Sequence, residues 1–204
     1  MTGCEKEDQA FTKRRTEIAK ELFRKSIHMF SAVVPFLLHF AYWPVLVLLM
    51  LVVLVYSVSE IARINGKKIP LISNITTFAA RSRDENRFVL GPVTLACGII
   101  LSALFWKEEY ARIGIFALAF GDGSASLAGK LYGRVEVPFA DGKTVAGSLT
   151  CFFAIFVSSF AVCGNAFAAL ILSLAGMLIE VLPLKDFDNL LIPVSIGGLA
   201  TLLL

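Results

Sequence analysis

Residues 29–59 read MFSAVVPFLLHFAYWPVLVLLMLVVLVYSVS and contain no Asp, Glu, Lys or Arg. An uncharged apolar stretch of about 18 residues or more is long enough to cross a lipid bilayer as a helix. Three further runs without charge have the same character, and they cover Phe88–Trp106, Thr144–Ile179 and Asn189–Leu204. This distribution predicts an all-α, polytopic transmembrane helical bundle.

The composition of the whole chain agrees with this prediction. Of its 204 residues, 57% are hydrophobic and only 17% are charged, whereas a typical soluble domain has about 25% charged residues. Composition therefore argues against a water-soluble globular domain and excludes a disordered chain. The net charge of +3 comes without a basic patch interleaved with aromatic residues, so we expect a lipid bilayer as partner and no nucleic acid.

We predict about seven membrane spans in one catalytic domain that covers residues 26–204. The spans run approximately over Ser26–Ala41, Trp43–Ala62, Arg87–Phe105, Tyr110–Ala128, Thr144–Cys163, Ala166–Leu182 and Asp188–Leu204. Residues 1–25 form a predicted amphipathic segment on the cytoplasmic surface, since Phe11, Ile18 and Leu22 share one helical face. A soluble helical extension is the alternative for this segment.

The placement of basic residues predicts the orientation. The N-terminal segment and the loops after spans two, four and six carry 17 of the 19 Lys and Arg residues, and the other side carries only Lys107 and Arg112. By the positive-inside rule, the N-terminus then lies in the cytoplasm and the C-terminus outside. We therefore expect a multi-pass integral membrane protein, in the inner membrane if the source is bacterial.

Asp122 is the first candidate for function, because it lies inside the fourth predicted span. A carboxylate at membrane depth costs about 2.5–3.5 kcal/mol on insertion scales, so such a residue is a functional candidate. A buried Asp that pairs with a Lys or caps a broken helix is the alternative. Gly121 precedes it, Ser126 shares its helical face, and Gly129 and Gly133 would let a phosphate or another helix approach.

A candidate phosphate site lies where the fifth span begins. Lys143 and Thr144 precede a Gly147–Ser148 step, and the free N–H groups and positive dipole of a helix N-terminus attract anions. The Gly-Lys-Thr sequence resembles the end of a Walker A loop, but Val137 stands where that motif needs glycine. Any nucleotide site here is therefore not a P-loop.

Two further groups enter the spans from the same side. Arg24, Lys25 and His28 lie at the start of the first span, where the basic pair could alternatively serve only as an interfacial anchor. Glu180 is the sole charge near the end of span six, and Asp188 and Asn189 are expected to cap span seven.

The predicted topology brings all of these groups to the cytoplasmic leaflet. Carboxylates suit Mg²⁺ or another divalent cation, which binds one or two of them together with substrate phosphates, and Asp122, Glu180 and Asp188 are the candidate ligands. The basic residues suit the phosphates themselves. The set predicts a site where a water-soluble phosphate compound meets a lipid.

In this order along the chain, the motifs resemble the dolichol kinase, phytol kinase and CTP-dependent diacylglycerol kinase family. The similar residues are Arg24-Lys25-x-x-His28, Gly121-Asp122-x-x-Ala125-x-x-x-Gly129-x-x-x-Gly133, Pro138, Lys143-Thr144-x-x-Gly147-Ser148 and Asp188-Asn189-Leu190-x-x-Pro193. The resemblance implies transfer of the γ-phosphoryl group of CTP, or another nucleoside triphosphate, to a polyprenol-, phytol- or diacylglycerol-type hydroxyl. It further implies that Mg²⁺ takes part.

The same resemblance implies roles for individual residues. Asp122 would bind the metal or the phosphates, and Lys143 would hold phosphate charge with Arg24 and Lys25. The base for the lipid hydroxyl stays open among His28, Asp122 and Asp188.

Two other functions stay as alternatives. A phosphatidate cytidylyltransferase would use the same nucleotide but attach CMP to phosphatidate. A non-enzymatic transporter would have polar groups spread over both membrane halves. It is disfavoured, because the polar groups of this chain cluster on one side.

Overall fold

The computed structural model describes residues 3–67, 76 and 87–204, with side chains from residue 15 onward. Its elements within these ranges are helices, and one isolated β-bridge joins Glu136 to Thr144. The predicted all-α class is therefore confirmed for the described part of the chain.

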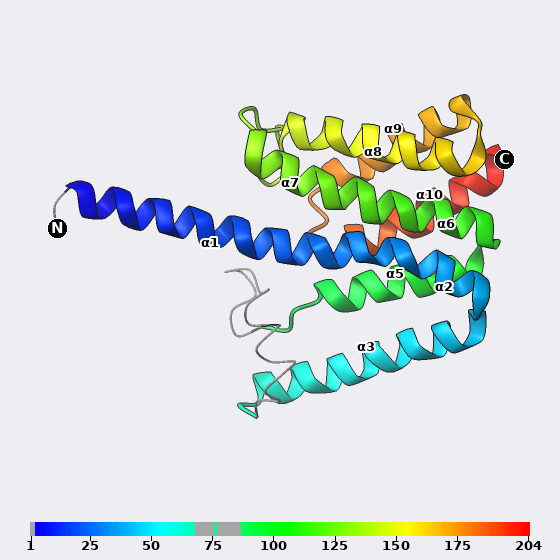
Figure 1. Cartoon of the computed structure of the whole chain (residues 1–204), viewed down its shortest axis with the longest axis horizontal. Helices are drawn as coiled ribbons and strands as arrows, with labels where there is room; N and C mark the ends of the chain where they lie inside the picture. Colours follow the sequence, from blue (N-terminus) through cyan, green and yellow to red (C-terminus); the bar gives the residue numbers. More distant parts are fainter. Residues whose placement is uncertain (1–2, 68–75, 77–86) are drawn as a thin grey trace.

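The chain begins with one long helix that folds back through a short turn. Helix α1 (Gly3–Phe30) continues through a 3₁₀ turn (Ser31–Val33) into α2 (Val34–Phe40). Helix α3 (Tyr42–Ile64) then runs back in the opposite direction, and α1 extends beyond the ends of the other helices (Figure 1). The predicted boundary between residues 25 and 26 falls inside α1, and the division into a surface segment and a catalytic domain stays a prediction. The Phe11 side chain lies outside the described ones.

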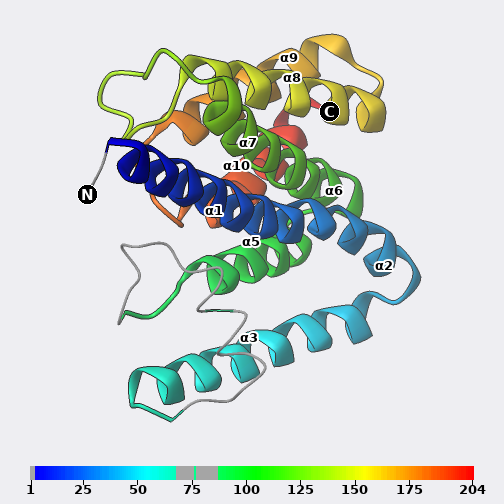
Figure 2. The same cartoon turned by 60° about the vertical axis from the view of Figure 1, so that its left-hand side comes forward.

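Seven further helical elements form the bundle. They are α5 (Gly91–Phe105), α6 (Glu108–Phe116), the π-helical segment η3 (Ala117–Asp122), α7 (Gly123–Tyr132), α8 (Val145–Cys163), α9 (Ala166–Val181) and α10 (Asp188–Leu203). Helix α10 packs against α5, α6 and α9, and Figure 2 shows it behind α6 and α7 in the middle of the bundle.

Local sequence explains where the C-terminal helices begin and end. The Thr144 side chain accepts a hydrogen bond from Gly147 N and caps α8, and the Asn165 side chain caps α9. Gly164 lies between them with a φ of 66°, a left-handed conformation that favours glycine. The predicted break between two helices at this point is confirmed.

The apolar exterior fits a bilayer. Among the described residues, two helices, α3 and α8, are long and apolar enough to cross a membrane, and only 17% of an 18-residue apolar window of α3 is buried. Shorter apolar helices are α5, α9 and α10. The seven spans and the cytoplasmic N-terminus stay predictions.

Candidate active site

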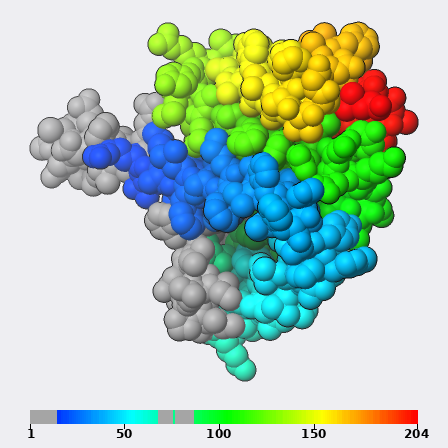
Figure 3. Space-filling view, turned by 45° about the vertical axis from the view of Figure 1, so that its right-hand side comes forward, coloured from blue at the N-terminus to red at the C-terminus, as the bar shows by residue number. Residues whose placement is uncertain are grey.

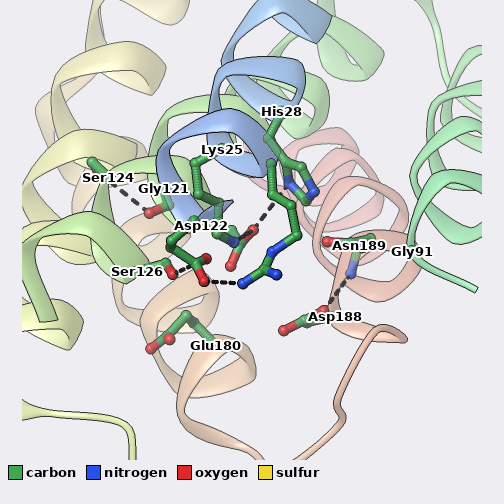
Figure 4. A network of polar contacts seen from close by, with 12 residues as sticks. Lys25, His28, Gly91, Gly121, Asp122, Ser124, Ser126, Glu180, Asp188 and Asn189 are labelled. Atoms are coloured by element: carbon green, nitrogen blue, oxygen red, sulfur yellow. Dashed lines mark hydrogen bonds and ion pairs between the residues drawn. The ribbon is translucent and has the colours of Figure 1, made fainter. Parts of the chain in front are cut away.

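A polar cavity of about 420 Å³ opens at the end of the bundle where α8 begins. Its walls come from α1, the η3–α7 junction, the 141–147 loop, the end of α9 and the start of α10. Ten residues singled out from the sequence line it, and they are Arg24, Lys25, Asp122, Ser126, Gly129, Lys143, Thr144, Gly147, Glu180 and Asp188. Segments far apart in the sequence thus form one site, and Figure 4 shows five of these side chains, Lys25, Asp122, Ser126, Glu180 and Asp188.

Asp122 is the buried centre of the first group of contacts. It ends the π-helical segment η3, a type of irregularity that is frequent at functional sites. Its Oδ2 lies 2.5 Å from Lys25 Nζ and 3.1 Å from His28 Nδ1. The Lys25 and Asp122 side chains are only 5% and 7% exposed, so the pair fixes α1 against η3. The alternative interpretation from the sequence, a buried Asp that pairs with a Lys, therefore also describes Asp122.

Lys143 is the centre of the second group. Its Nζ lies 3.5 Å from Glu180 Oε1 and 3.7 Å from Asp188 Oδ2, and it also donates a hydrogen bond to the backbone carbonyl of Glu180. A tight turn presents this lysine, with Asp141 and Gly142 in left-handed conformations. Lys143 therefore reaches across the cavity from the loop to the last turn of α9 and the first residue of α10.

Glu21 belongs to the site and was missed in the sequence. Its carboxylate accepts a hydrogen bond of 2.6 Å from Ser126 Oγ, lies 2.8 Å from Lys130 Nζ and pairs with Arg24. The available signal was its position one turn before Lys25, on the face that contacts η3 and α7. Glu21 links the two sides of the cavity rim, α1 and α7.

The surrounding cations keep Glu21 ionised. Burial by itself would raise the pKa of Glu21, but the hydrogen bonds from Lys130 and Ser126 and the charges of Arg24 and Lys25 together lower that pKa to about 2. The cavity therefore carries this negative charge at any physiological pH, and the cations around it are partly neutralised.

Two glycines singled out in the sequence, Gly121 and Gly133, lie at close packing contacts. A Cβ on Gly121 would lie 2.7 Å from the Ile155 side chain, and one on Gly133 would lie 2.2 Å from the carbonyl oxygen of Gly129 and 2.6 Å from Thr144. Neither glycine lines the cavity. Gly121 thus lets η3 pack closely against α8, and Gly133 lets the end of α7 approach the residue that caps α8, while their part in phosphate binding stays a prediction.

The start of α10 differs from the expected cap. Phe187 occupies the N-cap position and makes no capping hydrogen bond through its side chain. Asp188 Oδ1 accepts a hydrogen bond of 2.9 Å from Asn189 N, and Asn189 Nδ2 donates to Thr94 Oγ1 over 3.3 Å. Asn189 thus joins α10 to α5 and does not line the polar cavity. Ser148 does not line it either, but its hydroxyl donates a hydrogen bond to Glu180, which does.

The carboxylates suit a metal only in combination with phosphates. No group of three or more His, Cys, Asp or Glu side chains is arranged to hold a metal ion within the described residues. Asp122, Glu180 and Asp188 nevertheless line one cavity, and Mg²⁺ commonly takes one or two carboxylates and completes its shell with phosphates and water. The donor set therefore fits a divalent cation that arrives with a nucleotide.

Comparison with known proteins identifies relatives of the chain. A probable phytol kinase 1 of Oryza sativa subsp. japonica is 30% identical, with 89% of this chain and 64% of the relative covered. A probable phytol kinase 1 of Glycine max is 29% identical, with coverages of 67% and 46%, and a farnesol kinase of Arabidopsis thaliana is 28% identical, with coverages of 54% and 41%. The chain thus spans between about two fifths and two thirds of the length of these relatives.

No family model matches the chain. No solved structure matches it either. Sequence similarity to curated proteins therefore carries the assignment, and it agrees with the resemblance seen in the motifs. Curated homologues of the chain are therefore phytol and farnesol kinases, at about 30% identity over most of the chain.

Proposed function

We propose that the protein is a membrane-embedded lipid-alcohol kinase. It transfers the γ-phosphoryl group of a nucleoside triphosphate to a polyprenol-, phytol- or diacylglycerol-type hydroxyl at the cytoplasmic leaflet. The observation that carries the proposal is the polar cavity, in which Lys143, Arg24 and Lys25 face a set of carboxylates at the end of an otherwise apolar bundle. The names of the relatives support an alcohol as acceptor.

The proposed membrane arrangement has about seven spans and a cytoplasmic N-terminus. The exposed apolar surfaces of α3 and α8 support it, because such surfaces are stable in contact with lipid. The cavity lies at the end of the bundle where α3 ends and α8 begins, and the segments at this end carry most of the basic residues. The positive-inside rule therefore directs the cavity toward the cytoplasm and its nucleotides.

In the proposed reaction, positioning and charge neutralisation do most of the chemical work. Lys143, Arg24 and Lys25 hold the phosphates. The hydroxyl oxygen of the lipid forms a bond to the γ-phosphorus, the bond from that phosphorus to the β–γ bridging oxygen breaks, and the nucleoside diphosphate leaves. The hydroxyl proton passes to a basic side chain, for which His28, Asp122 and Asp188 are the candidates.

A divalent cation, Mg²⁺ in the first place, is part of the proposal. Asp122, Glu180 and Asp188 would hold it, and when bound it neutralises charge on the phosphates. Removing divalent cations with EDTA should therefore abolish turnover, and adding Mg²⁺ should restore it.

Labelled nucleotides test the proposed reaction. Protein purified in detergent is incubated with [γ-³²P]CTP and farnesol, phytol or diacylglycerol, and in parallel with [α-³²P]CTP and phosphatidate. A kinase moves the γ-label into the lipid alcohol and releases CDP. Incorporation of the α-label into phosphatidate, with release of pyrophosphate, would instead establish a cytidylyltransferase.

We also propose CTP as the preferred donor. Unlabelled CTP should then compete with the labelled CTP more strongly than ATP does. Equal competition by ATP would contradict this preference and leave the kinase reaction itself intact.

A further inference from the structure

A second cavity adjoins the polar one along α1. It has a volume of about 110 Å³ and is bounded by α1, α3, α5, the start of α10 and, outside these helices, Thr76 and Asp186 among others. Much of its wall is apolar, from Ile27, Tyr56, Val89, Pro92 and Leu95. In the space-filling view the surface is hollowed between α1 and α3 (Figure 3).

The two cavities share part of their walls. Arg24, Lys25 and Asp188 line both of them, whereas Asp122 lines only the polar cavity and His28 only the apolar one. Two cations and one carboxylate therefore stand at the junction between a polar and an apolar space. A phosphate in the first cavity and a hydroxyl in the second would meet at these three side chains.

The apolar wall is fixed by hydrogen bonds to the segment before α5. Tyr56 donates from its hydroxyl to the carbonyl of Val89 over 3.0 Å, and the Glu60 carboxylate accepts from Val89 N over 2.9 Å. Arg63 holds Glu60 through two hydrogen bonds of 2.7 and 2.9 Å. Polar side chains of α3 thus pin the backbone of Val89, so this wall is already formed.

The apolar cavity also borders the exterior. Ile27 lines the cavity and is 44% exposed on α1. An aliphatic chain that lies along the outside of the bundle can therefore continue past Ile27 toward the junction. The small cavity volume accommodates the hydroxyl end of such a chain, while the rest stays outside in the lipid.

We propose that the apolar cavity is the subsite for the acceptor alcohol, with its hydroxyl at the junction formed by Arg24, Lys25 and Asp188. This inference rests on the proposed kinase function and adds the acceptor's binding site to it. The nucleotide occupies the polar cavity, and the alcohol approaches from the α3 side of α1.

Filling the apolar cavity tests the proposal kinetically. Leu95→Trp places a large ring in the cavity, and Leu104→Trp, on the same helix but half exposed and away from the cavity, is the matched control. Leu95→Trp should raise the KM for farnesol by about tenfold or more, as expected when apolar contacts with a substrate are lost. The KM for the nucleotide should stay unchanged in both variants.

Ile27→Trp provides the same test at a position where folding is less sensitive, because Ile27 is 44% exposed. If both Leu95→Trp and Ile27→Trp leave the KM for farnesol unchanged, or raise the nucleotide KM equally, the subsite is wrong. Transfer of label by the wild type in the same assay shows independently that the kinase function holds.

Photo-crosslinking tests binding without turnover. A diazirine analogue of farnesol is irradiated with the purified wild-type protein, and the modified residues are located by mass spectrometry. Adducts should appear on Ile27, Val89 and Leu95 and should disappear when excess farnesol is present. Adducts confined to the outer face of α3 and insensitive to farnesol would overturn the subsite, whatever the activity assay shows.

Discussion

The two ends of the bundle both carry ion pairs, but they differ in burial. At the cavity end, the Lys25 and Asp122 side chains are 5% and 7% exposed. At the opposite end, Glu108 contacts His39 and Arg112, and the Glu108 and His39 side chains are 44% and 60% exposed. The α6–η3–α7 run connects the ends, with Glu108 and Asp122 about 20 Å apart along it at roughly 1.5 Å per residue.

This difference separates a structural pair from a candidate functional one. An exposed ion pair is solvated and contributes at most about 1 kcal/mol, so the Glu108 contacts place little demand on the fold. Burial of charged groups is unfavourable even when they are paired, and such groups mark functional sites in membrane proteins. The cavity end therefore keeps an arrangement that stability alone does not favour.

The largest expected effect is the loss of turnover in Lys143→Ala. Lys143 is the cation between Glu180 and Asp188, and removing one preorganised charge that stabilises a transition state lowers kcat by about 100- to 1,000-fold. Transfer from [γ-³²P]CTP to farnesol measures the loss. Glu108→Gln, at the opposite end, is the matched control and should keep full activity.

The next effect is on stability. Lys25→Met removes the lysine partner of the buried Asp122 carboxylate and leaves it with His28 alone. Breaking a buried ion pair in this way costs about 3–5 kcal/mol, whereas the double variant with Asp122→Asn recovers part of this loss. Thermal unfolding in detergent should rank wild type above the double variant and the double variant above Lys25→Met. A single variant as stable as the double one would show that the pair is not buried as described.

A smaller effect is expected from glycine packing beside the cavity. Gly133→Ala forces a Cβ against the Gly129 carbonyl oxygen and to within 2.6 Å of the Thr144 side chain, and such overpacking costs about 1–3 kcal/mol. Gly91→Ala meets nothing within 4 Å and should unfold at the wild-type temperature. Equal melting temperatures for all three proteins would contradict the close contact of α7 with Thr144.

The smallest effect concerns acid stability. Glu21 has a pKa lowered to about 2 from its ordinary value of 4.5. Its contribution to stability is therefore complete above about pH 4.5 and is lost as the pH falls toward 2, since the unfolded chain takes up the proton first. Glu21→Gln should lower the melting temperature at pH 7 and flatten its dependence on pH below 4.5. An unchanged pH profile would argue against the contacts with Lys130 and Ser126.

Much of the helical framework could be predicted from the sequence, because local signals define it. Thr144, Gly164 and Asn165 set the ends of α8 and α9 through caps and a left-handed turn. Asp122 was recognisable as a candidate, since an isolated carboxylate in an apolar run has few structural explanations. These features depend on residues near one another in the chain.

What could not be predicted depends on contacts between distant residues. Lys25 and Asp122 are 97 positions apart, and nothing local connects Glu21 with Ser126 and Lys130. Gly121 looked like part of a phosphate site, yet its environment is Ile155 on another helix. The second cavity could not be predicted either, because its walls come from segments between residues 24 and 189 that meet only in the folded chain.

The central claim, that the polar cavity is the active site, is tested most directly by comparing phosphoryl transfer in the Asp122→Asn and Glu108→Gln variants. Both substitutions remove one carboxylate charge from the same helical run, one at the cavity and one at the opposite end. With [γ-³²P]CTP and farnesol, we expect Asp122→Asn to lose transfer by about 100-fold or more and Glu108→Gln to match the wild type. Equal rates in folded samples of both variants would contradict the assignment of the polar cavity as the active site.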